Sequence, residues 1–130
     1  MAWTGFRGAR GMVRSAPAVV MAVVLAGLAG CHSYHVDAKV ENRTGAAINL
    51  LEVDYPSASF GDESLADGAD FQYRFQLRGD GPVKVEYTAP GGRQVQITGP
   101  SLSERQEGQL EILLLPGGKG EFHPHLTPAQ

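Results

Sequence analysis

The sequence predicts an all-β domain, a small antiparallel β-sandwich of about six to seven strands. Apolar and polar residues alternate along most of the chain after residue 33, which is the period of a strand with one buried face. Clusters of Gly, Pro, Asn and Asp recur at intervals of roughly ten residues, as turns between short strands do. Within this region we find no pattern with the period of a helix.

Residues 34–41 form the first predicted strand, and a turn follows at residues 42–45. Residues 42–44 also match a glycosylation sequon, but a turn is the simpler interpretation. The next predicted strand covers residues 47–55, and its apolar positions change face between Leu50 and Leu51. A β-bulge would explain that change. The alternative is a central strand that is buried on both faces.

Pro56 ends that strand, because proline cannot donate to a strand ladder. Residues 56–70 show no clean period, so we expect a long connection that crosses between sheets. The clearest strand follows, with four large apolar side chains on one face. Burying each of them is worth about 1.5 to 3 kcal/mol, so we expect this strand to anchor the core. These side chains are Phe71, Tyr73, Phe75 and Leu77.

A hairpin is predicted after the turn at residues 79–82. Val83 to Thr88 and Gln94 to Thr98 alternate in polarity, and the glycine-rich segment 89–93 lies between them. Two alternating runs around a short glycine-containing loop are typical of a β-hairpin.

The C-terminal part is predicted to hold one more strand and then a tail. The apolar run 109–115 favours a strand that ends at Pro116. A helix over residues 103–115 is the competing interpretation, which Gly108 disfavours by about 1 kcal/mol relative to Ala. Residues 116–130 contain little apolar surface, so we expect them to be a disordered tail.

The predicted strand count is similar to that of immunoglobulin-like and transthyretin-like sandwiches. The Cys and Trp signature of immunoglobulin domains does not occur after residue 33. The similarity is therefore one of architecture, and it implies no function. On this interpretation the sandwich domain spans residues 34–115.

The N-terminal residues 1–30 have the composition of a secretory signal peptide. Residues 1–14 carry three arginines and no acidic residue, and residues 15–30 form an uncharged run rich in Ala, Val and Leu. This run is marginal as a permanent membrane span, which needs roughly 20 predominantly apolar residues. We therefore exclude residues 1–30 from the folded domain.

The end of this segment resembles the lipobox of bacterial lipoproteins, on the residues Leu28, Ala29, Gly30 and Cys31. The resemblance implies that a signal peptidase cuts before Cys31 and that the Cys31 thiol carries a diacylglycerol. Residues 31–33 would then be a lipidated anchor and short linker. Two or three acyl chains hold a protein on a membrane far more firmly than one.

The same resemblance implies a cellular location, and it means that the only thiol is not available for a disulfide or a metal site. The protein is expected in the cell envelope, on the inner or outer membrane at its periplasmic face, or at the cell surface. His32 rather than Asp follows the anchor, so by similarity to enterobacterial sorting the protein need not stay at the inner membrane. Because Cys31 is the sole cysteine, no disulfide is available to the domain.

Charge excludes one class of partner. Three of the 11 Lys and Arg residues lie before residue 31. Residues 31–130 therefore contain eight basic and 14 acidic residues, which gives a formal charge of −6. Nucleic acids and anionic membrane surfaces reward a basic patch, so we expect no nucleic-acid partner.

Two groups of residues could bind a metal, and both signals are weak. His123 and His125 in the expected tail, and the pair His32 and His35, have imidazole nitrogens that suit Cu²⁺ or Zn²⁺. The two pairs are far apart in the sequence, and we expect solvent-exposed histidines and no cofactor.

Four carboxylates within residues 62–70 suggest calcium. Their spacing departs from the EF-hand loop, and its final bidentate Glu is missing. We expect these acids to solvate a connection. They are Asp62, Glu63, Asp67 and Asp70.

No catalytic motif occurs in the chain, and we expect no enzyme. Tyr55 and Phe60 flank small residues and could form an interface, since aromatic residues are enriched at binding hot spots. The other interpretation is that Phe60 folds back and caps the end of the sandwich. The function predicted is a lipid-anchored, non-catalytic accessory module that binds another envelope protein. A small-ligand or metal binder that uses the histidines or the acidic segment is the alternative.

Overall fold

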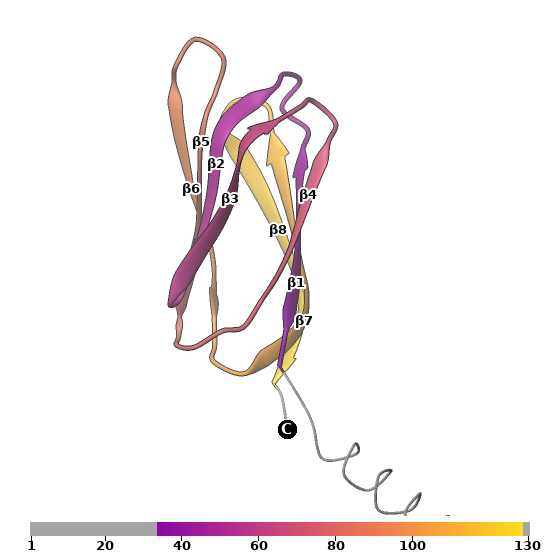
Figure 1. Cartoon of the computed structure of the whole chain (residues 1–130), viewed down its shortest axis with the longest axis vertical. Coiled ribbons are helices and arrows are strands. Elements are labelled where there is room, and N and C mark those ends of the chain that lie inside the picture. The colour runs from indigo at the N-terminus through magenta and orange to yellow at the C-terminus, as the bar shows by residue number, and fades with distance from the viewer. Residues whose placement is uncertain (1–33, 129–130) are drawn as a thin grey trace, which may run out of the picture. The chain divides into compact units, whose positions relative to one another are not determined.

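The computed structural model describes residues 34–128, which form one compact unit of two packed β-sheets (Figure 1). The predictions for residues 1–33, including Leu28, Ala29, Gly30, Cys31 and His32, lie outside the described residues. Within residues 34–128 no helix is long and apolar enough to cross a membrane. The eight strands are β1 (Val36–Asn42), β2 (Ile48–Tyr55), β3 (Ala58–Leu65), β4 (Asp70–Phe75), β5 (Gly81–Thr88), β6 (Gln94–Leu102), β7 (Gln106–Leu115) and β8 (Lys119–Pro128).

Each sheet has four strands, in the orders β4-β1-β7-β8 and β3-β2-β5-β6. All neighbouring strands pair antiparallel except β1 and β7, which run parallel from Val36↔Gly108 to Asn42↔Leu114. The predicted all-β sandwich is confirmed, with eight strands in place of six or seven. The parallel pair brings the first strand beside the seventh, so the first sheet joins segments far apart in the sequence.

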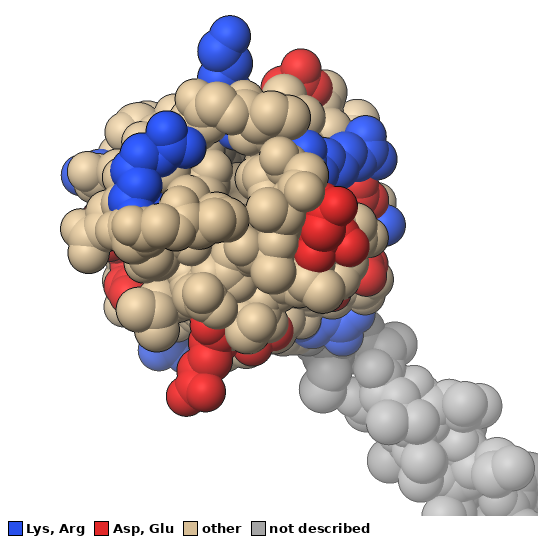
Figure 2. Space-filling view, turned by 90° about the horizontal axis from the view of Figure 1, so that it is seen from above, with Lys and Arg blue, Asp and Glu red and all other residues tan. Residues whose placement is uncertain are grey.

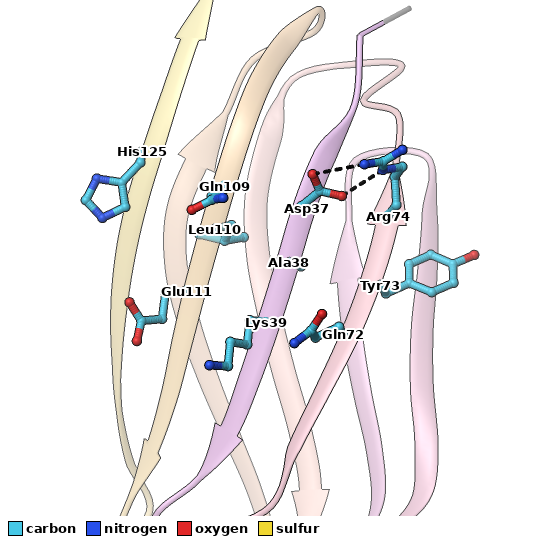
Figure 3. A pocket seen from close by; sticks show the side chains of 10 residues that line it. All are labelled: Asp37, Ala38, Lys39, Gln72, Tyr73, Arg74, Gln109, Leu110, Glu111 and His125. Carbon is cyan, nitrogen blue, oxygen red and sulfur yellow. Dashed lines mark hydrogen bonds and ion pairs between the residues drawn. The ribbon is translucent and has the colours of Figure 1, made fainter.

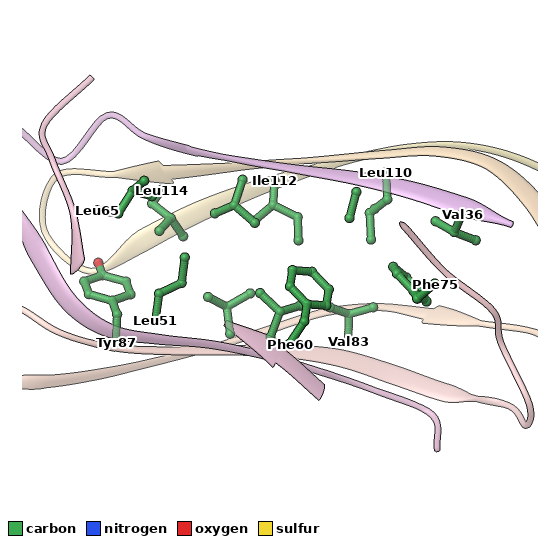
Figure 4. Close-up of a cluster of buried hydrophobic side chains, with 14 of the residues drawn as sticks. Val36, Leu51, Phe60, Leu65, Phe75, Val83, Tyr87, Leu110, Ile112 and Leu114 are labelled. Carbon is green, nitrogen blue, oxygen red and sulfur yellow. The ribbon is translucent and has the colours of Figure 1, made fainter. Parts of the chain in front are cut away.

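The core lies between the sheets and consists almost entirely of aliphatic and aromatic side chains (Figure 4). Val36 and Val40 from β1 face Val53 and Val85 from the other sheet, and all four are at most 1% exposed. Their neighbours in the sequence point outward, because successive side chains of a strand alternate between its faces. The polar residues predicted on the wet face of each strand therefore form the outer surfaces of the sandwich.

The predicted bulge in β2 is confirmed. The register between β2 and β5 shifts between Asn49 and Glu52, and Leu50 adopts a left-handed φ of 51°. As a result Leu50 is 66% exposed while Leu51 is 3% exposed. The alternative of a strand buried on both faces is wrong, because Glu52 is exposed.

The long connection expected at residues 56–70 is wrong, because most of it is strand β3. Tyr55 pairs with Ala58, so β2 and β3 form a tight hairpin in which Ser57 has φ 90°. Of the side chains of β3 only Phe60 and Leu65 are buried, which explains the weak sequence pattern. Gly61 fits here because a Cβ would overlap the Leu51 carbonyl oxygen.

The disordered tail expected at residues 116–130 is also wrong, because Lys119–Pro128 forms β8. Gly117 and Gly118, with φ of 79° and 73°, make the turn from β7 into β8. β8 then pairs with β7 along its whole length, and Phe122 is partly buried against the core. β7 itself starts at Gln106, earlier than the strand predicted from residue 109.

Asn42 shows that residues 42–45 form a structural turn. Its side chain is wholly buried, and its amide donates to the carbonyl oxygens of Ala46 at 2.8 Å, Leu65 at 3.0 Å and Ala66 at 3.1 Å. Its Oδ1 accepts hydrogen bonds from the backbone N and hydroxyl of Thr44 at 3.0 and 2.7 Å. Such a group ties the β1–β2 turn to the end of β3, since a buried amide left unpaired is costly.

Candidate functional site

The candidate site is a polar hollow of about 490 Å³ on the outer face of the sheet β4-β1-β7-β8 (Figure 3). It lies open to solvent across the neighbouring strands β4, β1 and β7, and His125 of β8 lies at its edge. Leu110 and Ala38 contribute to its floor, whereas the Tyr73 ring points away from the other lining side chains. The polar side chains around it are Asp37, Lys39, Gln72, Arg74, Gln109, Glu111 and His125.

Strand pairing places these side chains in rows across the sheet. Asp37 pairs with Arg74 on one side and with Gln109 on the other, and Gln109 pairs with His125. Paired residues of neighbouring strands point to the same face. The hollow therefore combines side chains of β1, near the start of the domain, with side chains of β4 in its middle and of β7 and β8 near its end.

Asp37 and Arg74 form the best-defined ion pair of the hollow. Arg74 Nε donates to Asp37 Oδ1 at 2.7 Å, and its Nη2 donates to Oδ2 at 3.4 Å. The hydrogen bond from Arg74 lowers the pKa of Asp37 below its ordinary value, and the same bond raises the pKa of Arg74. Both side chains are at least half exposed, at 50% and 65%, so solvent limits the contribution of this pair to stability.

A second charged group lies along the same face. Lys39 Nζ is 3.0 Å from Glu41 and 3.8 Å from Asp70, and Arg43 Nη2 is 2.6 Å from Glu41. The hydrogen bond between Lys39 and Glu41 raises the pKa of Lys39 and lowers that of Glu41. Charges of both signs thus alternate over this sheet. Figure 2 shows the same mixture at the end of the domain that lies at the top of Figure 1.

The outer face of the other sheet also carries both signs, since Asp54 lies opposite Lys84, but it places two carboxylates opposite each other as well. Glu52 lies opposite Glu86 across β2 and β5. A hydrogen bond with Asp54 and the charges of Asp54 and Glu86 raise the pKa of Glu52. Like charges directly opposite on a sheet repel.

The histidines predicted as metal candidates do not gather into a cluster within residues 34–128, and His32 lies outside these residues. His123 and His125 both point outward from β8, and His123 Nε2 is 3.3 Å from Glu121 Oε2. His35 precedes β1 and is 3.5 Å from Gln76. Within residues 34–128 no three His, Cys, Asp or Glu side chains gather closely enough to hold a metal ion.

The four carboxylates of the acidic segment are spread over three elements. Asp62 and Glu63 lie in β3, and Asp67 Oδ1 accepts a hydrogen bond from the Gly45 backbone N at 3.1 Å. Asp70 begins β4, near Lys39. The segment is thus two strands and a turn in place of one acidic loop.

Tyr55 and Phe60 belong to an aromatic cluster between β3 and β4. Phe60 is 6% exposed and its ring stacks on Tyr73 with centroids 4.7 Å apart, while Tyr55 stacks on Phe75 at 4.1 Å. Burial raises the pKa of Tyr55. Phe60 therefore lies at the β3–β4 edge of the core, and its burial favours the capping interpretation over the interface interpretation.

Tyr73 is the exposed member of that cluster, and the sequence pattern placed it in the core. It points to the core side of β4, yet it is 43% exposed because β4 is the outermost strand of its sheet. Phe75 and Leu77 are each 5% exposed, and Phe71 is partly buried. β4, the strand predicted to anchor the core, therefore contributes to one edge of the core only.

Comparison with known proteins supports the fold alone. No protein-family model matches the chain, and no curated protein sequence matches it. The fold is similar to an NMR structure of a protein from Eubacterium rectale, with a TM-score of 0.53 and 11% identity over 74% of this chain and 95% of that one. At this identity the likeness carries no function.

Proposed function

We propose that this protein is a lipid-anchored, non-catalytic module of the bacterial cell envelope that binds another envelope protein. The observation that carries the proposal is the sequence Leu28 to Cys31 placed just before a folded domain. β1 begins at Val36, so only a few residues separate the proposed lipid from the sandwich. Such a short tether keeps the domain close to the membrane surface.

The polar hollow is the proposed binding face. It offers donors from Lys39 and Arg74, acceptors from Glu111 and Asp37, and amides that do both. The hollow lies open on a sheet, so a loop or edge of a second protein could reach these groups. Charged rims of this kind set the orientation and specificity of a partner more than its affinity.

A small polar ligand is the second candidate, because the hollow has a size typical of ligand pockets. Its volume of about 490 Å³ lies within the usual range of about 300 to 1,000 Å³. His125 at its edge adds an imidazole, which can donate or accept a hydrogen bond. This candidate predicts a ligand that stays bound to the purified protein.

The anchor is tested by comparing wild type with Cys31→Ala in a bacterial host. The wild-type chain is expected in the membrane fraction and in the detergent phase, labelled by radioactive palmitate. The Cys31→Ala chain should lose the label. A wild-type chain that takes no label would contradict the proposal.

The binding face is tested with a photoreactive phenylalanine analogue at Gln109 or, as a matched control, at Gln96. Both are exposed glutamines on outer faces, one in β7 beside the hollow and one in β6 of the opposite sheet. Irradiation of cells should give a discrete protein adduct from position 109 and none from position 96. Equal adducts from both positions, or none from either, would reject this face. A small molecule released from the purified wild-type protein would favour the second candidate.

A further inference from the structure

Among the four edge strands of residues 34–128, β4 alone contains neither proline nor glycine. It pairs with β1 through six consecutive residues without a register shift. The other edges are interrupted, since β6 contains Pro100, β8 contains Pro124 and β3 contains Gly61. Proline and glycine weaken an edge as a template for a further strand, and regular edges invite one. The free side of β4 is therefore the best place for strand addition.

The sequence of β4 is complementary to itself when it is reversed. Its outward residues are Asp70, Gln72 and Arg74, so opposite charges flank a central glutamine. Its inward residues next to Gln72 are two aromatics, Phe71 and Tyr73. Two antiparallel copies of such a strand can place each charge opposite its counter-charge.

We propose that a second copy of this chain pairs antiparallel with the free edge of β4. The side-chain period of two allows only registers that keep the two core faces on the same side. Centring the pair on Gln72 places Asp70 opposite Arg74 of the second copy, and the reverse. A shift by one residue to a centre at Phe71 or at Tyr73 leaves both charges without a counter-charge. The register centred on Gln72 is thus the one that charge selects.

The aromatic cluster supports the same register. Centred on Gln72, Tyr73 lies opposite Phe71 of the second copy on the core side. Tyr73 is 43% exposed in the single chain and stacks on Phe60 at 4.7 Å, so its outer surface is available for a further ring. Cross-strand aromatic pairs stabilise sheets. The pairing would cover the exposed ring on both copies.

Existing ion pairs are compatible with this arrangement. Arg74 would lie between Asp37 of its own chain and Asp70 of the second copy, and Asp70 keeps Lys39 nearby. Both partners of the new pair are partly solvent-exposed now, at 45% for Asp70 and 65% for Arg74. The contact is isologous, as in most two-fold dimers. It would join two four-stranded sheets into one.

The proposed lipid at Cys31 restricts how such a dimer sits on a membrane. Antiparallel pairing makes the two β1 strands start from opposite ends of the joined sheet. From Cys31 to Val36 the chain spans at most roughly 17 Å. Both lipids then reach one leaflet when the joined sheet lies along the membrane surface with its two-fold axis normal to it.

Disulfide trapping of the full chain in its bacterial host tests the pairing. In the proposed register Gln72 meets Gln72 of the second copy, at a spacing of roughly 4.5 to 5.5 Å that a disulfide can bridge. Gln72→Cys is expected to give a covalent dimer on a non-reducing gel after mild oxidation. Gln109→Cys, exposed on the same face but two strands inward, should stay monomeric. A monomeric Gln72→Cys, or equal crosslinking of both variants, would overturn the pairing.

The wild-type chain separates failure of this inference from failure of the proposed function. Its only thiol is Cys31, which a lipid would block. A wild-type dimer linked through Cys31 would contradict lipidation. It would not bear on the β4 pairing, which the Gln72→Cys variant tests separately.

A charge variant tests the register. Asp70→Lys loses its contact with Lys39 but lies opposite Glu41 within its own chain, so the folded domain should tolerate it, whereas it opposes Arg74 of the second copy. In the Gln72→Cys background it is expected to lower the crosslinked fraction roughly tenfold. Glu52→Lys, the same change of charge opposite Glu86 on the other sheet, should leave crosslinking unchanged. Unchanged crosslinking with Asp70→Lys would overturn the register.

Discussion

The two open sides of the sandwich are closed in different ways. On the β3 and β4 side, aromatic rings fill the space between the sheets, with Phe60 in contact with both Tyr73 and Phe75. On the β6 and β8 side the sheets approach closely, because glycine lies under a large side chain. A Cβ on Gly99 would be 2.6 Å from the Phe122 ring, and one on Gly120 would be 3.0 Å from Ile97.

This difference determines which side can take a partner. The glycine side is covered by its own side chains, and Pro100 and Pro124 interrupt its backbone edges. The aromatic side keeps one exposed ring, Tyr73, beside a regular edge strand. A side filled by rings can leave one ring exposed for a partner, whereas a side closed on glycine has no room for another atom unless a neighbouring side chain shifts.

Removing the central ring should have the largest effect. Phe60→Ala is expected to lower the free energy of unfolding by about 3 to 5 kcal/mol, because it empties a buried volume that four other aromatic rings surround. Equilibrium denaturation of wild type and variant measures it. A loss below about 1 kcal/mol would mean that the ring does not close this side.

Adding one methyl group to the other side should have the next largest effect. Gly99→Ala is expected to cost about 1 to 3 kcal/mol, because its Cβ meets the Phe122 ring. Combining it with Phe122→Leu should recover part of the loss, since the smaller side chain leaves room. The same denaturation experiment on the single and double variants measures this coupling. Additive losses would contradict close contact between the two residues.

Tyr73 should matter little for stability and much for association. Tyr73→Ser is expected to change the free energy of unfolding by about 1 kcal/mol or less, because the ring is partly exposed and its stacking contributes only modestly. In the Gln72→Cys background it should reduce disulfide trapping. A loss as large as that of Phe60→Ala, measured in the same denaturant series, would make Tyr73 a core residue and remove the contrast between the two rings.

The smallest effect concerns the pH response of the β4 edge. Hydrogen bonding to Arg74 lowers the pKa of Asp37 from its ordinary value of 3.8. The stability from this group is present above pH 3.8 and is lost as pH falls through the lowered pKa. Arg74→Gln should bring the pKa of Asp37 back toward 3.8, as an NMR titration of its carboxyl carbon would show. Identical titration curves in both chains would mean that the ion pair does not form in solution.

The sequence predicts the strands with strong alternation and misses those at two edges. β1, β2, β5 and β6 are found near their expected positions, and the bulge at Leu50 follows from the change of face. The weak patterns of β3 and β8 predict a connection and a tail instead. Each buries few side chains and is held largely by backbone pairing to β2 or β7, which leaves little trace in the order of residues.

The candidate site could be predicted only in part. Alternation shows that Asp37 and Lys39 face solvent on their strand, and it shows the same for Arg74 on another. That these two faces share one sheet depends on the antiparallel pairing of β1 with β4. The parallel pairing of β1 with β7 adds Gln109 and Glu111, and both pairings join segments far apart in the sequence. The sequence alone does not decide the role of Phe60, because an aromatic residue between small residues fits an interface and a cap of the core equally well.

The lipid on Cys31 is the claim on which the proposed function depends, and the intact mass of the protein extracted from the envelope tests it most directly. The expected mass is that of residues 31–130 plus a thioether-linked diacylglycerol, with or without a third acyl chain on the new amino group. A chain that begins at another residue, or that begins at Cys31 with a free thiol, would contradict the account.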